Sequence, residues 1–258
     1  MINLDVFEVI NKVLWSRRLR TAILNLFYAL TFEYAVIKLK EKANSCKNVE
    51  NCVDLAFNIF TTFLFELWRI RPGQVKDEIM RLLEILIRYR PKFILEVGTA
   101  RGGSFFLFTR VAASDATLIT IDLPSGPLGG GYSELKIPYY ESFALPGQKI
   151  CLLRMDSHKE TTLHAINRIL DGHELDFLFI DGDHTYQGVK KDFEMYGKLV
   201  RKGGIITFHD IVPRLPENVG GVPRFWNEVK YNFNYAELIK DWKQGGMWNR
   251  CYLCVMLN

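Results

Sequence analysis

The stretch FILEVGTARGGS at residues 93–104 decides how the rest of the sequence is interpreted. It begins with a short apolar run of strand character, passes through a turn that contains Gly98, Gly102 and Gly103, and leads into a helical pattern. Glycine allows the positive φ of a tight turn and leaves the backbone open to a close ligand. The order of strand, glycine turn and helix predicts the first unit of a parallel α/β sheet with a ligand at the turn. Many α/β proteins carry such a turn, so the rest of the chain must decide what it binds.

From Pro91 onward, short apolar runs alternate with helical patterns and glycine turns, which is typical of βαβ units. The runs are continuously apolar, as expected for a sheet that helices cover on both faces. We expect strands at 93–97, 117–121, 149–154, 176–180 and 204–208, then an antiparallel pair at 235–240 and 251–257. We expect helices near 103–112, 160–170, 187–200 and 222–232. The predicted fold class is α/β, a Rossmann-like, doubly wound, mainly parallel seven-stranded sheet with a final antiparallel strand.

Residues 1–90 have a different texture, because they contain a single glycine, Gly73, and a single proline, Pro72. Their apolar residues recur at helical spacing, which predicts three or four helices. We therefore place an N-terminal helical extension at 1–72 and the α/β domain at 73–258. The extension is expected either to cap the ligand pocket or to form a dimer, and the sequence does not decide between these roles.

Charge and hydropathy exclude several classes of function. The net charge is only +4 and no long run of lysine or arginine occurs, so no nucleic-acid surface is expected. The most apolar long stretch, residues 21–40, is interrupted by Glu33, so no transmembrane helix is predicted. A helix lying on a membrane surface, aided by Arg17, Arg18 and Arg20, stays open beside the favoured core or dimer helix.

The N-terminus and the cysteines indicate the cellular compartment. No cleavage site of a secretory signal follows the first apolar residues. The five cysteines do not supply the two CxxC motifs of a common zinc site. We therefore expect reduced thiols in a cytoplasmic protein.

An acidic residue stands at the carboxyl end of every predicted parallel strand. Ligands of open α/β sheets bind at this edge, and buried carboxylates without partners are costly to desolvate. A ligand site therefore explains these acids better than packing does. The residues at the strand ends, in chain order, are Glu96 before the glycine turn, Asp122, Asp156 with Ser157, Asp181 with His184, and His209 with Asp210.

Glu96 and the turn after it resemble the acidic-x-Gly-x-Gly-x-Gly motif of class I S-adenosylmethionine-dependent methyltransferases, with Ala100 in place of the middle glycine. The segment FIDGDHTYQGVKKDF at 179–193 and the pair His209-Asp210 are similar to the cephalosporin-hydroxylase-like and macrocin-type O-methyltransferase group. The resemblance covers about residues 73–258, which it identifies as a class I methyltransferase domain. It implies S-adenosylmethionine as the cofactor.

The resemblance also implies roles for the residues at the strand ends. The methionine part of the cofactor would be held by Glu96, Gly98, Thr99, Ala100, Gly102 and Ser104. Asp122 would accept both ribose hydroxyls, and Asp156 and Ser157 would border the adenine. Asp181 is counted with the cofactor-binding residues as well. The residues alone also allow Asp122 as an acid of a solvated turn and Asp156 as a helix cap.

A hydroxyl nucleophile must lose its proton during methyl transfer, and two devices are compatible with the sequence. His184 is expected to act as general base, because histidine titrates near neutral pH, and Asp181 beside it is counted as catalytic. A divalent metal held by Asp181, His209 and Asp210 is the second device. The resembling families carry a carboxylate where this chain has His209, and a nitrogen ligand suits Mn²⁺, Fe²⁺ or Zn²⁺ better than Mg²⁺. Without a metal, His209 becomes a second candidate base.

The expected reaction is methyl transfer to a hydroxyl of a small molecule or sugar. The long segments 123–147 and 211–224 are expected to form the substrate walls. The aromatic residues that either line this pocket or belong to the core are Tyr132, Tyr139, Tyr140 and Trp226. Two alternatives stay open: a nicotinamide-dependent oxidoreductase, against which the missing G-x-G-x-x-G argues, and a cofactor-binding protein without catalysis.

Overall fold

A seven-stranded sheet with the order β3-β2-β1-β4-β5-β7-β6 forms the centre of the computed structural model. The structure describes residues 17–61, 63–124, 131–213, 220–240 and 253–257. The parallel strands are β1 (Phe93–Val97), β2 (Thr117–Asp122), β3 (Lys149–Arg154), β4 (Leu175–Ile180) and β5 (Val200–Phe208). The chain then adds β6 (Asn234–Leu238) and β7 (Leu253–Leu257), and β7 runs antiparallel to both β5 and β6. The predicted α/β fold class is confirmed.

The strand order changes direction at β1, which lies between β2 and β4. The connections that leave β1 and β4 therefore run to opposite sides, and a crevice opens between them at the carboxyl ends of these strands. The glycine turn follows β1 directly and Asp181 follows β4 directly. The fold thus brings the two strongest sequence signals to the same crevice.

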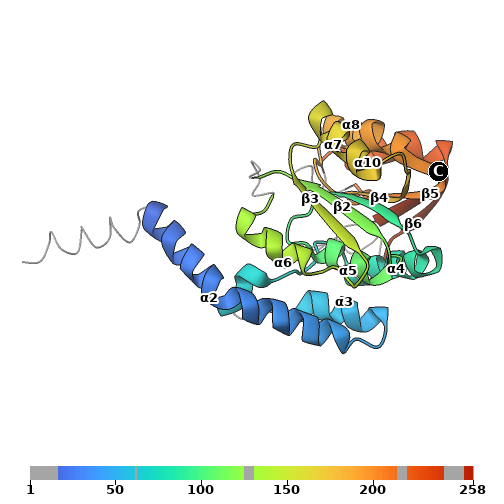
Figure 1. The fold of residues 1–258 in the computed structure, drawn as a ribbon. Coiled ribbons are helices and arrows are strands. Elements are labelled where there is room, and N and C mark those ends of the chain that lie inside the picture. Colours follow the sequence, from blue (N-terminus) through green and yellow to red (C-terminus); the bar gives the residue numbers. More distant parts are fainter. Residues whose placement is uncertain (1–16, 62, 125–130, 214–219, 241–252, 258) are drawn as a thin grey trace, which may run out of the picture.

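Helices cover both faces of the sheet, as Figure 1 shows. On one face lie α7 (Glu160–Leu170), α8 (Tyr186–Tyr196) and α10 (Val222–Val229), with the short 3₁₀ helices η3 (Gly197–Leu199) and η4 (Lys230–Asn232). On the other face lie α4 (Lys76–Tyr89), α5 (Gly103–Val111), η2 (Glu134–Lys136) and α6 (Ile137–Glu141). The strands accordingly feed two buried clusters: Ile94 of β1 packs with α5, whereas Leu95 and Val97 pack with α7 and α8.

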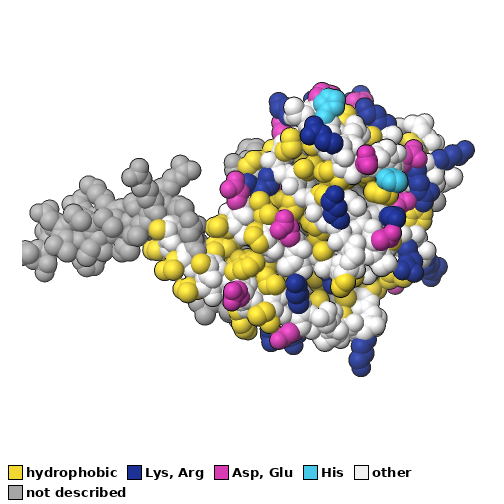
Figure 2. Space-filling view, viewed as in Figure 1, with side chains coloured by type: hydrophobic (Ala, Val, Ile, Leu, Met, Phe, Trp, Pro, Cys, Tyr) yellow, Lys and Arg dark blue, Asp and Glu magenta, His cyan; other side chains and the backbone are white. Residues whose placement is uncertain are grey.

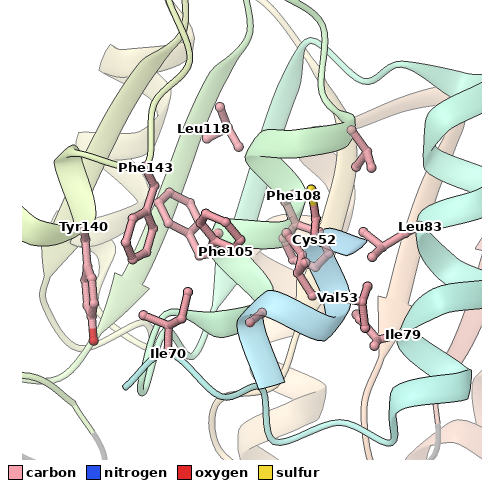
Figure 3. Packing of buried hydrophobic residues seen from close by; sticks show 14 of the residues in the cluster. Cys52, Val53, Ile70, Ile79, Leu83, Phe105, Phe108, Leu118, Tyr140 and Phe143 are labelled. Atoms are coloured by element: carbon pink, nitrogen blue, oxygen red, sulfur yellow. The ribbon is translucent and has the colours of Figure 1, made fainter. Parts of the chain in front are cut away.

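The N-terminal extension packs onto the sheet domain through shared core residues. Its described elements are α2 (Arg17–Asn44), α3 (Val49–Asn58) and η1 (Phe63–Trp68). Figure 3 shows Cys52 and Val53 of α3 close to Phe108 of α5, inside one buried cluster. Tyr139 of α6 donates a hydrogen bond of 2.9 Å to the carbonyl of Trp68. Residues on both sides of the expected boundary at 72/73 therefore share a core, and the role of the extension as cap or dimer element stays a prediction.

The helix α2 leaves the body of the molecule toward its N-terminal end (Figure 1). Apolar side chains gather on this outer part, as Figure 2 shows in yellow, and Leu26 and Leu30 are 61% and 73% exposed. Within the described ranges, no helix combines the length and the apolar character needed to cross a membrane.

The strand β5 differs from the expectation, because it begins at Val200 and not at residue 204. Gly203 and Gly204 lie inside the strand, and Gly203 has a φ of +75°. The pairing with β4 shifts register between Leu175 and Phe177, opposite this region. The glycines interrupt the apolar pattern where the strand is irregular, so the sequence suggested a strand start where the structure has a bulge.

Candidate active site

Residues 98–102, here called the glycine loop, turn sharply between β1 and α5. Gly98 and Gly102 have φ values of +96° and +76°. A Cβ atom on Gly98 would lie 2.1 Å from the carbonyl oxygen of Asp181, so only glycine fits there. Ala100, which stands where the resembling motif has its middle glycine, has a φ of +45° and accepts the left-handed conformation. The glycine loop is thus pressed against the first residue after β4.

Glu96 lies fully buried beneath the glycine loop. Ser104 Oγ donates to Glu96 Oε1 at 2.5 Å, and Thr120 Oγ1 donates to Oε2 at 3.2 Å. Burial raises the pKa of Glu96 well above its ordinary value, although the two hydroxyl donors act in the opposite direction. In the structure Glu96 binds Ser104 at the start of α5, and both of its carboxyl oxygens accept hydrogen bonds from protein hydroxyls.

Asp122, at the end of β2, lies beside the glycine loop. Its Oδ2 accepts a 2.7 Å hydrogen bond from the Ala100 amide, and its Oδ1 accepts one of 2.8 Å from the Leu123 amide. Burial raises the pKa of Asp122, and the backbone donors, of which Ala100 is the strongest, oppose this shift. The carboxylate is half-buried and stands one strand away from the crevice, which is where a ribose acceptor is expected.

Asp156 and Ser157 occupy the turn after β3, as expected for residues beside an adenine. Asp156 Oδ1 accepts a 2.9 Å hydrogen bond from the His158 amide, and its carbonyl accepts one of 2.6 Å from Thr162 Oγ1. The Ser157 carbonyl accepts a hydrogen bond from the Tyr196 hydroxyl. These contacts shape the turn before α7. The N-cap of α7 is Lys159, without a side-chain hydrogen bond, so the structure does not show Asp156 as the helix cap that the sequence also allowed.

Four side chains converge at the carboxyl ends of β4 and β5. We call Asp181, His184, His209 and Asp210 the acid–histidine cluster; one ligand atom from each lies within 4.8 Å of the others. His209 Nδ1 is 2.7 Å from Asp181 Oδ1, and His184 Nε2 is 3.3 Å from the same oxygen. His184 Nδ1 lies 3.2 Å from Asp210 Oδ2. The structure therefore brings together all the residues predicted for catalysis and for a metal, and it adds His184 to the metal set.

Opposite charges dominate the electrostatics of this cluster. Burial would raise the pKa of Asp181, but His209 and His184 hold it well below its ordinary value. The hydrogen bond to Asp181 raises the pKa of His184, with burial acting in the opposite direction. The side chain of His184 is 39% exposed, whereas those of His209 and Asp210 are each 4% exposed. His184 is therefore the member of the cluster best placed to meet a ligand.

The donor set of the acid–histidine cluster fits a divalent cation. Two carboxylates and two imidazoles within 4.8 Å of one another match the usual ligands of first-row transition metals. Two nitrogen donors favour Mn²⁺, Fe²⁺ or Zn²⁺ over Mg²⁺.

Two further residues contact the site: Gln74, which the sequence analysis did not single out, and Tyr140, which it named only as a pocket or core aromatic. Gln74, which precedes α4, donates from Nε2 to Asp181 Oδ2 at 2.8 Å. The Tyr140 hydroxyl donates to the carbonyl of Ala100 at 2.9 Å and so holds the glycine loop from below. Neither belongs to a motif: Gln74 stands 107 residues before its partner, and Tyr140 looked like a core or pocket aromatic.

A second histidine–carboxylate pair joins the turn after β3 to helix α8. His158 Nε2 is 3.2 Å from Asp192 Oδ1, and Asp192 is fully buried in α8. The Asp192 carboxylate lies near Gly182, where a Cβ atom would be 3.4 Å from it. The side chain of His158 is 22% exposed, because it reaches this buried acid.

The expected substrate walls are described only in part. Tyr132, Tyr139, Tyr140 and Trp226 are buried in the core, with exposures of 5% or less. Residues 125–130 and 214–219 of the two expected wall segments lie outside the described residues. After the second gap, the Gly221 amide donates a 2.7 Å hydrogen bond to the His184 carbonyl, so this segment returns directly to the acid–histidine cluster.

Comparison with known proteins adds family information to this geometry. Residues 95–211 match a family model described as a methyltransferase domain. The chain is 36% identical over 117 residues to an uncharacterised protein of Acanthamoeba polyphaga mimivirus, which covers 45% of this chain and 50% of the relative. It is 32% identical over 143 residues to an uncharacterised protein of Sinorhizobium fredii, which covers 54% of this chain and 15% of that protein. The chain thus spans half or less of the length of these curated relatives.

Solved structures of methyltransferases are also similar to this chain. The O-methyltransferase TomG of Streptomyces achromogenes, solved with S-adenosylmethionine, gives a TM-score of 0.49 at 16% identity, over 83% of this chain and 91% of that chain. An O-methyltransferase of Bacillus cereus, solved with S-adenosylhomocysteine, gives 0.49 at 16% identity, over 83% and 93%.

The family match begins within β1 and ends just after β5, so it contains the glycine loop, Asp122 and the whole acid–histidine cluster. Residues 95–211 of this chain are therefore similar to a methyltransferase domain, and the match covers the part of the sheet that carries the candidate site.

Proposed function

We propose that this protein transfers the methyl group of S-adenosylmethionine to a hydroxyl of a small molecule or sugar. The observation that carries the proposal is the meeting of the glycine loop and the acid–histidine cluster in one crevice, where Gly98 packs against Asp181. A cofactor site and a group able to take a proton are then neighbours. Methyl transfer to oxygen requires the cofactor site to hold the methyl carbon beside the acceptor oxygen, while the neighbouring group takes the proton from that oxygen.

The cofactor would lie along the carboxyl ends of β1 to β3. The glycine loop and Ser104 would hold the methionine part, with Glu96 supporting them from beneath. Asp122 would accept the ribose hydroxyls in place of the Ala100 and Leu123 amides that it now binds. Asp156 and Ser157 would border the adenine, and Asp181 would stand at the sulfonium end of the cofactor.

In the reaction, the acceptor oxygen attacks the methyl carbon while the bond from carbon to sulfur breaks. The sulfonium becomes the neutral thioether of S-adenosylhomocysteine, and the hydroxyl proton passes to the protein. We assign this proton to His184, whose partners Asp181 and Asp210 stabilise the charge that it gains. His209 is the second candidate base, and its buried position beside Asp181 suits it better to orienting that acid.

A divalent cation would be held by Asp181, His209 and Asp210, with His184 as a further ligand. When bound, it would lower the pKa of the acceptor hydroxyl by acting as a Lewis acid. Metal-assisted and metal-free transfer are separated by dialysis against a chelator and readdition of Mn²⁺, Zn²⁺ or Mg²⁺. Loss and recovery of activity would establish the metal requirement.

Calorimetric titration with S-adenosylhomocysteine tests the cofactor assignment. We expect binding by the wild-type protein and at least about tenfold weaker binding by Asp122→Ala, because hydrogen bonds from the ribose to a charged acceptor are lost. Asp115→Ala, at an exposed acid that pairs with Lys92, is the matched control. Binding of NADH in place of S-adenosylhomocysteine would favour the oxidoreductase, and unchanged affinity in Asp122→Ala would remove Asp122 from the site.

Replacement of His184 tests catalysis against simple cofactor binding. With hydroxylated acceptors and labelled S-adenosylmethionine, His184→Ala should lower kcat by roughly 10²–10⁴-fold and leave affinity for S-adenosylhomocysteine unchanged. His164→Ala, on the exposed side of α7, is the control. If the wild type binds the cofactor but methylates no acceptor, the alternative of a cofactor-binding protein without catalysis is favoured.

The N-terminal helices and the location of the protein complete the proposal. Exposed apolar residues of α2, among them Leu26 and Leu30, support a contact surface on this helix, for a second copy or for a membrane surface. Gel filtration with light scattering and vesicle sedimentation distinguish these partners. A cytoplasmic location is supported by the free thiols of Cys46, Cys52 and Cys151.

A further inference from the structure

Gln74 is the one described side chain from before β1 that hydrogen-bonds to a residue of the acid–histidine cluster. It is 5% exposed and donates from Nε2 to Asp181 Oδ2 at 2.8 Å. An amide side chain carries two donors at one end and an acceptor at the other. Asp181, ionised beside two histidines, can only accept, and this fixes the Gln74 nitrogen toward the acid. The Gln74 oxygen must therefore face elsewhere.

That oxygen is buried and accepts no hydrogen bond from any residue that the structure describes. Buried acceptors without a donor are uncommon in native structures, because desolvation of the carbonyl is not compensated. Such an atom next to a binding site indicates a donor that arrives with the ligand.

The surroundings of Gln74 indicate which part of the ligand this donor belongs to. The chain just before Gln74 packs on the start of α5: a Cβ atom on Gly103 would lie 2.0 Å from the Ile70 carbonyl oxygen and 2.5 Å from the Pro72 nitrogen. Asp181, the partner of Gln74, packs in turn on Gly98. Gln74 therefore stands where the glycine loop and the acid–histidine cluster meet, at the methionine end of the proposed cofactor.

The methionine part carries one cationic donor, its α-ammonium group. Glu96 is the acid expected to serve this end, but it is fully buried and already accepts from Ser104 and Thr120. The ammonium group thus needs another acceptor at the edge of the crevice. We infer that Gln74 binds the α-ammonium of the cofactor through Oε1 while its Nε2 orients Asp181. This inference rests on the proposed function, because it assumes that S-adenosylmethionine occupies the crevice.

Comparison of two ligands tests the inference. S-adenosylhomocysteine carries the α-ammonium, whereas 5′-methylthioadenosine has the same adenosine and thioether but lacks the amino-acid part. Gln74→Met should weaken calorimetric binding of S-adenosylhomocysteine by about tenfold or more, as for a lost hydrogen bond to a charged group, and leave 5′-methylthioadenosine unchanged. Equal weakening for both ligands, or none for either, would overturn the inference.

A second variant separates the two contacts of Gln74. Gln74→Glu keeps an acceptor for the ammonium but cannot donate to Asp181 when ionised, so affinity for S-adenosylhomocysteine should be retained while kcat falls at least about tenfold. If Gln74→Glu instead weakens S-adenosylhomocysteine as much as Gln74→Met does, Oε1 does not receive the ammonium.

Gln148→Met is the matched control, because this glutamine donates to the carbonyls of Thr109 and Ala113 away from the crevice. It should leave affinity for both ligands at the wild-type level, and urea unfolding checks that each variant folds. Failure of the wild type to bind either ligand would count against the proposed function itself, a result distinct from selective failure of the Gln74 variants.

Discussion

Glu96 and Asp181 are acids at the ends of the neighbouring strands β1 and β4, yet their pKa values move in opposite directions. Glu96 is fully buried among neutral partners, the hydroxyls of Ser104 and Thr120, and burial raises its pKa. Asp181 is also largely buried, but His184 and His209 face it and hold its pKa low. The charge of the partners, and not depth alone, decides which acid stays ionised at the crevice.

This difference supports the proposed roles, in which Glu96 supports the glycine loop and Asp181 takes part in the reaction. A carboxyl group with a raised pKa behaves as a neutral hydrogen-bonding group, which suits the support of a tight backbone turn. A carboxylate held ionised by imidazoles can bind a cation or stabilise a proton on a histidine. Pairs of acids whose surroundings push their pKa values apart commonly mark a division of roles in an active site. The division that we propose runs between the glycine loop and the acid–histidine cluster.

The largest expected effect comes from replacing Asp181 with asparagine, and Glu96→Gln is the comparison. Asp181→Asn should lower kcat by roughly 10²–10⁴-fold, because the charge that holds His184 and His209 is lost. Glu96→Gln should change kcat by less than about tenfold and the free energy of unfolding by about 1 kcal/mol, because the hydroxyls of Ser104 and Thr120 can rotate to suit an amide. Steady-state kinetics and urea unfolding measure both. Equal losses of activity in the two variants would contradict the division of roles.

A smaller effect is expected at Gly98, where the glycine loop packs against Asp181. Gly98→Ala would place a methyl group 2.1 Å from the Asp181 carbonyl oxygen and would force alanine to a φ of +96°. We expect a loss of about 3 kcal/mol in the free energy of unfolding, from overpacking and backbone strain together.

Gly73→Ala is the matched control for Gly98, because a Cβ atom there would meet nothing within 4 Å. It should leave stability unchanged or raise it by less than about 1 kcal/mol, through the lower entropy of the unfolded chain. Similar losses of unfolding free energy in Gly73→Ala and Gly98→Ala would show that the close packing of Gly98 against Asp181 does not cause the loss.

The sequence predicted that the residues of the acid–histidine cluster lie close together, because these residues follow strands directly. An apolar run that ends in an acid places that acid at the carboxyl edge of the sheet, whatever the details of packing. The spacing of Asp181 and His184, together with the pair His209-Asp210, was therefore enough to place them near one another. The structure confirms that these side chains lie together and adds the shared contact of both histidines with one carboxylate oxygen.

The contacts of Gln74 and Tyr140 were harder to predict, because they join residues that no local sequence pattern connects. Gln74 reaches Asp181 from a segment that reads only as the entrance to a helix. Tyr140 was predicted to line the substrate pocket or to belong to the core, and neither alternative indicated that it donates to the Ala100 carbonyl. Such contacts depend on how the N-terminal helices and α6 pack against α5, which sequence periodicity does not specify.

A third buried acid, Asp192, pairs with a single histidine, His158. Replacing that histidine is expected to give the smallest effect, a change in stability that depends on pH. His158 has a raised pKa, caused first by the hydrogen bond to Asp192 and then by the charges of Asp192, Asp183 and Asp156, with burial opposing. A raised pKa in the folded state stabilises the protein fully below the ordinary histidine value of 6.5, and this stabilisation is lost as pH rises through the folded-state pKa. The pair should therefore strengthen the fold in acid and contribute less in mild alkali.

Urea unfolding of His158→Gln between pH 5.5 and 9 tests this dependence. The variant should be less stable than the wild type by on the order of 1 kcal/mol at the acid end, and the difference should shrink as pH rises. His164→Gln, at an exposed position on the same helix α7, should show no comparable trend. A difference that stays constant or grows with pH would mean that the charge of His158 does not bind Asp192. The contrast between Glu96 and Asp181 would then need both histidines that face Asp181, His184 and His209, to explain it.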